Sequence, residues 1–336
     1  MKEAIRAGLS AALVRSGATR LGRRLRRHDG TLILYGHRVA DDDEGYLQGL
    51  PPAYLREQLE YLTRHYEVIP LETLVACVEA RKPAPPRSVV LTFDDGFHDN
   101  VEVALPMLDA FGVTATIFVV TRSLETGELP WSQRLGYLFQ RTPCDAVAHP
   151  ALGDAPSTLT SSAERRRAYV GVKSSLVPLP RGARDAQIAE LARQLAVDPP
   201  TDRMMTWEHA RAAVAAGHGI GAHTYSHALL ARVPPLEARE EMARSLHDVR
   251  DQLGIDHPLF CFPAGSVDDR SVEVARELGF RSAFRPDRRR RLNLGTDCDA
   301  FALVRVGMPN APATQLEAEL DGPFHRLRSV AGRYGT

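Results

Sequence analysis

Cysteine is scarce in this chain of 336 residues, and no two cysteines form a Cys-x-x-Cys pair. The four cysteines are far apart, at Cys77, Cys144, Cys261 and Cys298. This spacing indicates neither a disulfide framework nor a cysteine-ligated metal site. Because reduced thiols are typical of proteins inside the cell, the expected location is cytoplasmic.

Net charge and long apolar runs are also missing. Lys and Arg total 42 and Asp and Glu total 42, so no bulk charge attracts the chain to nucleic acid. No stretch approaches the roughly 18 apolar residues that a membrane span requires. The hydrophobic content of 44% is enough for the core of one large domain. The composition favours a soluble enzyme without a nucleic-acid partner, and it indicates no oligomeric state.

The amino-terminal segment is strongly basic. Residues 1–28 hold eight Lys or Arg against one acidic residue. The apolar stretch at 7–14 is too short and too interrupted for a secretory signal. Ile5, Leu9 and Leu13 share one face of a helix. One interpretation is an amphipathic helix lying peripherally on the anionic inner membrane face; the other is a helix packed on the domain or a partly disordered extension.

Two adjacent carboxylates follow an apolar, β-branched run. Val89 to Leu91 leads into Asp94, Asp95 and Gly96. This pattern predicts a buried strand that delivers two acids to the mouth of a fold. Neighbouring carboxylates repel, so keeping both ionised requires a nearby cation or strong hydrogen bonds. A divalent metal held by one carboxylate would leave the other free as a base; a strand followed by an ordinary Asp-Gly turn is the alternative.

A histidine pair supports the metal interpretation. His223 and His227 are four residues apart, which predicts that they share one face of a helical turn. Two imidazoles and one carboxylate suit zinc or a similar divalent ion, and three protein ligands leave one coordination position open. A purely structural role for the two histidines is the alternative, since the chain has 12 histidines.

These segments resemble motifs of the polysaccharide deacetylases, the NodB-homology group or carbohydrate esterase family 4. Thr-Phe-Asp-Asp-Gly at 92–96 is similar to the first motif, and His-Thr-Tyr-Ser-His at 223–227 is similar to the second. Phe-Cys-Phe-Pro-Ala-Gly at 260–265 resembles a variant of the third. Tyr-Gly-His-Arg-Val at 35–39 is similar to the opening segment of bacterial surface-polysaccharide members.

The resemblance implies a site and an activity. Asp95, His223 and His227 would hold a divalent metal, zinc first, with cobalt, nickel or manganese as alternatives. Asp94 would be the general base, and the backbone N–H of Ala264 would stabilise the oxyanion. The implied reaction removes the N-acetyl group of an amino sugar in surface polysaccharide or glycoconjugate biosynthesis. The substrate partner is then an N-acetylated saccharide, and the enzyme is a hydrolase of carbon–nitrogen (non-peptide) bonds.

The chain departs from the family pattern at two positions. Cys261 stands where the family often has an arginine that positions the base, and Arg305 stands where the last motif commonly has a proton-donating histidine. Arginine stays protonated, so it is a poor proton donor but a good carboxylate partner. His37, which follows an apolar run at 31–35, is the first candidate for the general acid; a histidine that merely closes a strand is the alternative.

Three residues are candidates for substrate contact: Pro263, Arg305 and Trp131. Trp131 either stacks on a sugar ring or lies in a core. The basic run at 285–291 either contacts an anionic substrate, such as a lipid-linked or nucleotide-activated sugar, or forms a solvated loop.

Alternating strand and helix patterns predict a mostly parallel sheet, open or closed. The resemblance implies an irregular (β/α) barrel of the NodB-homology type, with its site at the carboxyl ends of the strands. We expect a basic helical extension at 1–30, the barrel at 31–312 with a mainly helical insertion at 121–203, and a tail at 313–336.

Two other functions remain open from the sequence. One is a catalytically silent carbohydrate-binding protein on the same fold, because the general acid is unassigned. The other is a hydrolase of a different, non-sugar amide.

Overall fold

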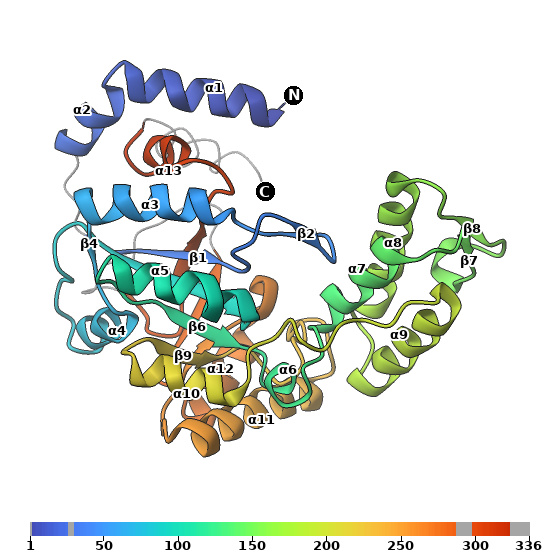
Figure 1. The fold of residues 1–336 in the computed structure, drawn as a ribbon. Coiled ribbons are helices and arrows are strands. Elements are labelled where there is room, and N and C mark those ends of the chain that lie inside the picture. Colours follow the sequence, from blue (N-terminus) through green and yellow to red (C-terminus); the bar gives the residue numbers. More distant parts are fainter. Residues whose placement is uncertain (1, 26–29, 287–297, 323–336) are drawn as a thin grey trace.

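A closed ring of parallel strands forms the centre of the molecule (Figure 1). The structure, a computed structural model, describes residues 2–25, 30–286 and 298–322, without the side chains of 2–5 and 25. Around the ring the strands are β1 (Leu32–Gly36), β12 (Leu303–Gly307), β11 (Ser282–Pro286), β10 (Leu259–Cys261), β9 (Gly219–Ala222), β6 (Thr116–Val119) and β5 (Ser88–Asp95). Pairing of β1 with β5 closes the ring, and β4 (Glu67–Val68) adds to β5. The closed ring confirms the predicted barrel.

Apolar side chains from six of the strands fill the interior of the barrel. Because side chains alternate along a strand, every second residue points inward. The inward set includes Ile33, Val90, Phe118, Cys261, Phe284 and Leu303. On β9 a Cβ at Gly221 would lie 2.6 Å from the Phe118 ring, so the missing side chain makes room for that ring. The packed interior supports polar residues at the rim.

Amphipathic helices cover the outside of the ring. They are α3 (Pro52–His65), α4 (Leu71–Glu79), α5 (Leu105–Ala110), α10 (Trp207–Ala215), α11 (Pro235–Leu253) and α12 (Asp269–Leu278). A π-helical turn at Asn100–Ala104 precedes α5. Pro106 has no N–H to donate into that turn, which explains its irregular hydrogen bonding. Gly254 ends α11 in a left-handed conformation, as expected for a helix-terminating glycine.

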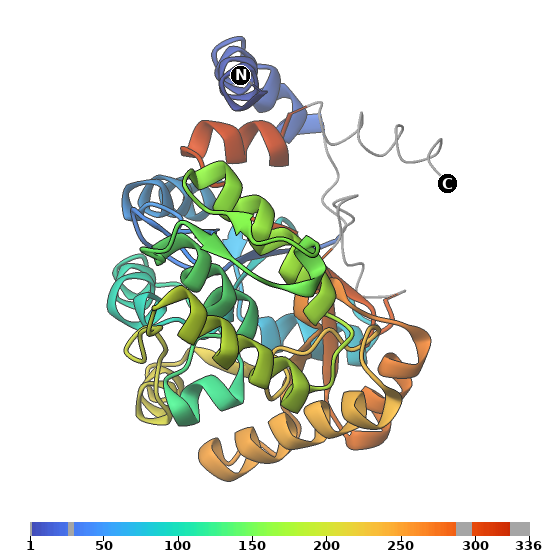
Figure 2. The ribbon, with the colours of Figure 1, turned by 90° about the vertical axis from the view of Figure 1, so that its right-hand side faces the viewer.

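The segment expected as an insertion carries its own small core. It contains α6 (Thr121–Thr126), α7 (Trp131–Arg141), α8 (Ser162–Leu176), α9 (Arg181–Leu195), a short 3-10 turn (Pro150–Leu152) and the hairpin of β7 (Ala146–Val147) and β8 (Ser157–Thr158). Figure 2 shows α7, α8 and α9 crossing in front of the barrel. Apolar residues of these three helices pack together, among them Leu135, Leu138, Val172, Ile188 and Leu191.

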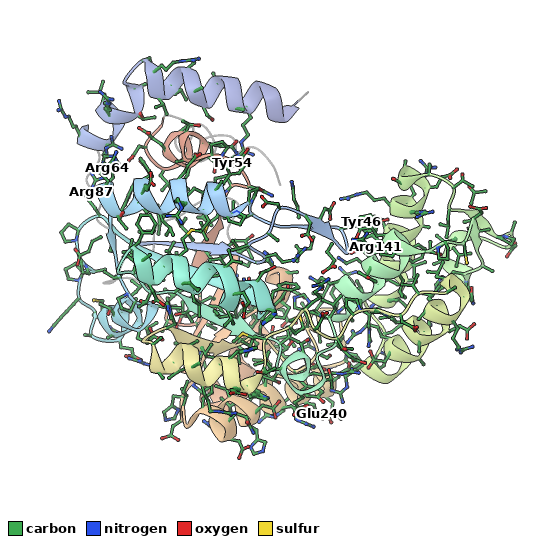
Figure 3. The ribbon with its side chains drawn as sticks, viewed as in Figure 1. Tyr46, Tyr54, Arg64, Arg87, Arg141 and Glu240 are labelled. Carbon is green, nitrogen blue, oxygen red and sulfur yellow. The ribbon has the colours of Figure 1, made fainter. Side chains whose placement is uncertain are left out.

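A second hairpin links the insertion to the barrel. It consists of β2 (Asp43–Glu44) and β3 (Leu47–Gln48). The Gly45 N–H donates to Gln140 Oε1 at 2.7 Å, and the Tyr46 and Tyr169 ring centroids are 4.9 Å apart. Figure 3 shows Tyr46 where this hairpin meets the insertion. The insertion is therefore held against the mouth of the barrel.

The amino-terminal helices pack on a helix near the other end of the chain. α1 (Lys2–Arg15) and α2 (Ala18–Leu25) lie beside α13 (Ala313–Leu320), which packs on α3 (Figure 1). Arg6 pairs with Glu319, and Thr19 Oγ1 donates to Glu317 at 2.7 Å. These contacts match the interpretation of a basic helix packed on the domain. The segment expected as a tail, 313–336, begins with a helix, α13.

Two further points concern the ends of the described chain. Among the helices described, none is both long and apolar enough to cross a bilayer. Of the basic run at 285–291, residues 287–291 lie outside the described residues; Arg285 and Pro286 end β11.

Candidate active site

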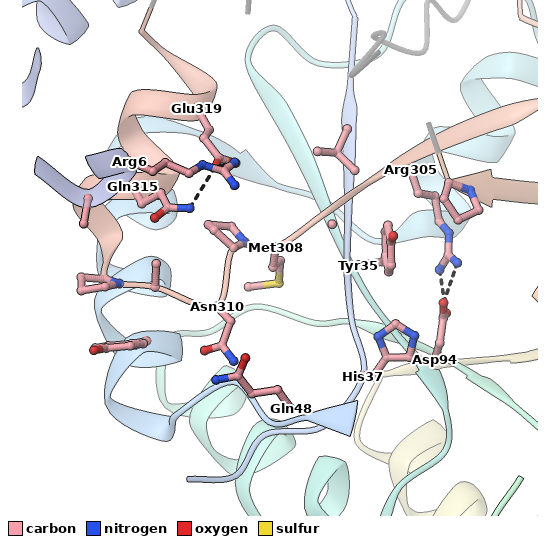
Figure 4. Close-up of a pocket in the computed structure, with 18 of the residues that line it drawn as sticks. Arg6, Tyr35, His37, Gln48, Asp94, Arg305, Met308, Asn310, Gln315 and Glu319 are labelled. Atoms are coloured by element: carbon pink, nitrogen blue, oxygen red, sulfur yellow. Dashed lines mark hydrogen bonds and ion pairs between the residues drawn. The ribbon is translucent and has the colours of Figure 1, made fainter. Parts of the chain in front are cut away.

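Asp94 is paired with an arginine inside the mouth of the barrel. It is the penultimate residue of β5. Arg305 reaches it from β12 through two parallel hydrogen bonds, Nη1 to Oδ1 and Nη2 to Oδ2, each 2.7 Å (Figure 4). The Arg305 side chain is 0% exposed. It also donates to Thr92 Oγ1 at 3.1 Å and to Cys261 Sγ at 2.6 Å. This bidentate geometry fixes both carboxylate oxygens of Asp94.

The pair keeps Asp94 ionised. Burial alone would raise the pKa of the Asp94 carboxyl, but the Arg305 guanidinium outweighs it and lowers that pKa to about 2. Burial lowers the pKa of Arg305, and Asp94 more than reverses this, so the guanidinium pKa is raised. Asp94 is therefore a carboxylate at neutral pH, as a general base must be.

Asp95 lies in a different environment, between the two histidines of the second motif. Its Oδ1 is 3.6 Å from His223 Nε2 and 3.3 Å from His227 Nε2. One donor atom from each of the three buried residues lies within 4.8 Å of the others. Within the part of the chain that the structure describes, Asp95 Oδ1 is buried and has no hydrogen-bond partner. A cation would satisfy such an oxygen.

The ionisation of these three groups also fits a metal. Burial, followed by the charge of Asp94, raises the pKa of Asp95 well above its usual value, so this carboxyl needs a nearby cation to stay ionised. Burial lowers the pKa of His223 to about 4 and that of His227 well below its usual value. His223 Nδ1 lies 2.7 Å from the Cys261 carbonyl oxygen, which can only accept, so Nδ1 carries the proton and Nε2 keeps a lone pair. Neutral imidazoles and one carboxylate are the donor set that zinc and similar ions prefer.

A loop, and not the predicted helical turn, brings the two histidines together. Residues 223–227 are irregular, and both Thr224 and His227 have left-handed backbone conformations, with φ of 64° and 59°. The prediction of a shared helical face was therefore wrong. Spacing alone cannot reveal left-handed residues, which fold the segment back so that the His223 and His227 ring centroids lie 5.1 Å apart.

Further candidates line a cavity above Asp94. His37 follows β1 and lies beside Asp94 in this cavity (Figure 4). Burial lowers the pKa of His37. Ala264 also lines the cavity, on a short turn (Pro263–Gly265) where its φ is 50°. The structure therefore brings both residues to the mouth, within one cavity that also contains Asp94.

Comparison with known proteins assigns the fold and site to a family. The sequence profile described as "Polysaccharide deacetylase" matches residues 81–143 and 201–283, which include the carboxylate pair, the histidine pair and the third motif. Over these two blocks the chain matches the polysaccharide deacetylase family. This finding confirms the family predicted from the sequence motifs. The unmatched residues between the two blocks fall within the helical insertion.

Individual curated relatives match only short parts of the chain. The poly-beta-1,6-N-acetyl-D-glucosamine N-deacetylase of Escherichia coli (strain K12) is 32% identical over 87 residues, 25% of this chain and 13% of that protein. The chain aligns with less than a fifth of the length of the curated relatives it matches, 19% and 13% for two of them.

Solved structures share the fold. Streptococcus pyogenes deacetylase PplD, in complex with acetate, matches with a TM-score of 0.57 at 16% identity, over 85% of this chain and 96% of that one. IcaB from Ammonifex degensii matches with a TM-score of 0.56 at 18% identity, over 90% of this chain and 98% of that one. Polysaccharide deacetylases are hydrolases of carbon–nitrogen bonds other than peptide bonds, the class predicted above.

The structure changes the interpretation of the three candidates for substrate contact in this deacetylase-family chain. Arg305 is committed to Asp94, so its guanidinium is a partner of the base and not a free substrate ligand. Trp131 is 4% exposed, donates from Nε1 to the His227 carbonyl oxygen at 3.0 Å and lies under Arg184. It therefore corresponds to the buried-core alternative and offers no ring face to a sugar. Pro263 is buried beneath Ala264 in the third-motif turn.

The sequence does not indicate three residues that support Asp95 and the second-motif loop at 223–227. Gln133 of α7 donates from Nε2 to Asp95 Oδ2 at 3.3 Å. Glu241 of α11 accepts from the Ser226 N–H and from its Oγ, each at 2.7 Å. Arg184 of α9 contacts Ser226 Oγ at 3.3 Å. No motif contains Gln133, Arg184 or Glu241. The path of the insertion places Gln133 and Arg184 at the site, and α11 on the outside of the barrel places Glu241 there.

Proposed function

We propose that this chain hydrolyses the N-acetyl group of an amino sugar in surface polysaccharide or glycoconjugate biosynthesis. The observation that carries the proposal is the contrast within the carboxylate pair. Asp94 already has a cationic partner in Arg305. Among the described residues no Lys or Arg pairs with buried Asp95, which forms a donor set with His223 and His227. This is the arrangement that a metal-dependent hydrolase requires.

Asp94 is suited to accept a proton from the attacking water. A divalent metal held by Asp95, His223 and His227 would supply polarisation of the acetamide carbonyl and a lower pKa for that water. Asp94 receives the proton because Arg305 keeps it ionised, and a positioned base typically contributes about 10²- to 10⁴-fold to the rate. The Ala264 N–H is the candidate donor to the oxyanion. We propose zinc as the metal, with cobalt, nickel or manganese as alternatives.

The leaving amine nitrogen needs a proton when its bond to the acetyl carbon breaks, and we assign that role to His37. It lies in the same cavity as Asp94, whose charge raises the His37 pKa against the larger lowering by burial. Proton donation requires the imidazolium form, so the contribution of His37 falls as the pH rises through its pKa. The products are acetate and a free amino sugar.

The cavity supports an extended saccharide as the substrate. Its volume of about 1110 Å³ exceeds the roughly 300–1,000 Å³ common for small-molecule sites. It runs from Asp94 past Met308 and Asn310 to Arg6 of α1 (Figure 4). Several sugar units of an N-acetylated glycan would fit this length better than a single monosaccharide.

We also propose a cytoplasmic location with peripheral contact to an anionic membrane face through α1 and α2. Leu9 and Leu21 are 48% and 58% exposed, and Arg15, Arg20 and Arg24 are exposed on the same helices. Cosedimentation with vesicles rich in anionic lipid, but not with neutral vesicles, tests this contact. Equal recovery from both vesicle types would contradict it.

The activity is tested by acetate release from a panel of N-acetylated oligosaccharides of increasing length. Zinc-loaded protein should release acetate and expose one amine per acetate, and the Asp94→Asn variant serves as the control. Saturable glycan binding without release would indicate a catalytically silent binding protein. Release only from non-sugar amides would indicate the other hydrolase.

A further inference from the structure

The amino-terminal turn of α7 contacts both ends of the metal-ligand set. Gln133 donates from Nε2 to Asp95 Oδ2 at 3.3 Å, and its own Oε1 accepts from Ser132 Oγ at 2.7 Å. The second bond orients the amide so that its NH₂ group faces Asp95. The preceding residue but one, Trp131, donates from Nε1 to the His227 carbonyl oxygen at 3.0 Å. Trp131, Ser132 and Gln133 therefore all take part, and they are consecutive residues of one helix turn.

The Gln133 contact distinguishes the two oxygens of Asp95. Oδ2 accepts from Gln133, while Oδ1 faces His223 Nε2 and His227 Nε2 at 3.6 and 3.3 Å. Within the described residues, Oδ1 is the buried oxygen without a hydrogen-bond partner. The geometry therefore leaves Oδ1 for the metal and uses Oδ2 to fix the plane of the carboxylate.

The Trp131 contact acts on a loop that needs support. Thr224 and His227 both have left-handed backbone conformations, which are unfavourable for residues with a Cβ and persist where the surroundings hold them. Two residues of the insertion, Trp131 and Arg184, bond this loop. The Arg184 Cζ lies 5.0 Å from the Trp131 ring centroid, so the two side chains also contact each other. Glu241 holds Ser226 from the opposite side.

We infer that α7 of the helical insertion completes the metal site, with Gln133 as the positioning residue for Asp95 and Trp131 as the positioning residue for His227. This inference rests on the proposed metal site. Partners of metal ligands orient the donor atoms before the ion arrives, and losing one typically lowers metal affinity by about 10- to 100-fold. The insertion thus contributes to metal affinity as well as to the shape of the mouth.

The experiment is a zinc titration of the metal-free full-length protein by calorimetry with a competing chelator. Gln133→Met removes the amide donor at similar side-chain volume and should raise the dissociation constant for zinc about 10- to 100-fold. Gln140→Met is the matched control, because Gln140 lies on the same helix but bonds the β2–β3 hairpin. Its dissociation constant should equal that of the wild type.

A second variant and a spectroscopic signal separate positioning from general damage. Trp131→Phe keeps an aromatic ring but removes the N–H, and it should also weaken zinc binding. With cobalt in place of zinc, the visible absorption bands should shift in Gln133→Met and not in Gln140→Met. Gln133→Asn keeps the amide on a shorter side chain, so its zinc affinity should lie between those of Gln133→Met and the wild type.

Three results would overturn the inference. Equal zinc affinity of Gln133→Met and wild type would remove the positioning role while leaving the metal site intact. Equal weakening in Gln133→Met and Gln140→Met would assign the effect to packing of the insertion. Absence of zinc binding by the wild type would overturn the proposed metal site itself, and this inference with it.

Discussion

Asp94 and Asp95 are neighbours on one strand, yet the structure places them in opposite electrostatic situations. The Asp94 side is built from barrel strands and contains its own cation, Arg305. The Asp95 side is built from a loop and from the insertion, and it gathers two imidazoles around a buried oxygen that has no hydrogen bond among the described residues. Under the proposed function, the same chemical group serves as a base in one place and as a metal ligand in the other.

The backbone explains how adjacent residues come to differ. Asp94 follows the regular alternation of β5 and points into the barrel with Thr92, where β12 supplies Arg305. Asp95 has a φ of 73° and leaves that alternation, which directs it toward the second-motif loop. In the proposed mechanism the role of each carboxylate follows from its cation, which is Arg305 for Asp94 and a bound metal for Asp95.

The largest effect should come from removing a ligand on the Asp95 side. His223→Ala deletes one of three donor atoms, so the protein should lose bound metal and turnover together. Metal content by mass spectrometry and acetate release measure the two losses. Full metal occupancy in this variant would contradict the ligand set.

Replacing Asp94, the proposed base, should lower turnover without removing the metal. Asp94→Asn keeps the size of the side chain but cannot accept the proton, so kcat should fall about 10²- to 10⁴-fold. Steady-state acetate release measures this loss. Turnover close to that of the wild type would remove the base assignment.

Breaking the internal ion pair should affect both stability and the pH profile. Arg305→Gln leaves Asp94 buried without its cation, which should lower the free energy of unfolding by about 3–5 kcal/mol. The base is active only when ionised, so its contribution disappears as the pH falls through the Asp94 pKa. Loss of Arg305 raises that pKa from about 2, and the acidic limb of kcat/KM should therefore move to higher pH.

Denaturant melts and a pH series of kcat/KM test this prediction. Arg305→Lys serves as the control, because it keeps the charge but loses the bidentate geometry. Its acidic limb should lie between those of the wild type and Arg305→Gln. An unchanged limb in Arg305→Gln would mean that Arg305 does not set the ionisation of Asp94.

The smallest effect is expected at Cys261, which contacts Arg305 on the Asp94 side and His223 on the Asp95 side. Its Sγ accepts from Arg305, while its carbonyl oxygen bonds His223 Nδ1. Cys261→Ser retains an acceptor and the carbonyl, so metal affinity should be unchanged and stability should change by about 0.5–1.5 kcal/mol at most. Zinc titration and thermal melts provide the check; a large loss of metal would show that the side chain itself shapes the ligand site.

The alternating pattern predicts a mostly parallel sheet, and the resemblance of the motifs predicts that it closes into a barrel. The four central side chains are predicted because their motifs are local. The apolar run before Asp94 and the short His223–His227 motif are each contiguous. Arg305 could be predicted only as a carboxylate partner in general, since the partner lies 211 residues away and only barrel closure brings the two together. Gln133 gave no signal, because its position depends on how the insertion folds back over the mouth.

The most direct test of this account is the metal content of Asp94→Asn beside that of Asp95→Asn, after identical zinc reconstitution. The two variants make the same chemical change at adjacent positions. We expect about one zinc per chain in Asp94→Asn, as in the wild type, and loss of that zinc in Asp95→Asn. Equal zinc content in the two variants would contradict the division of roles between base and ligand.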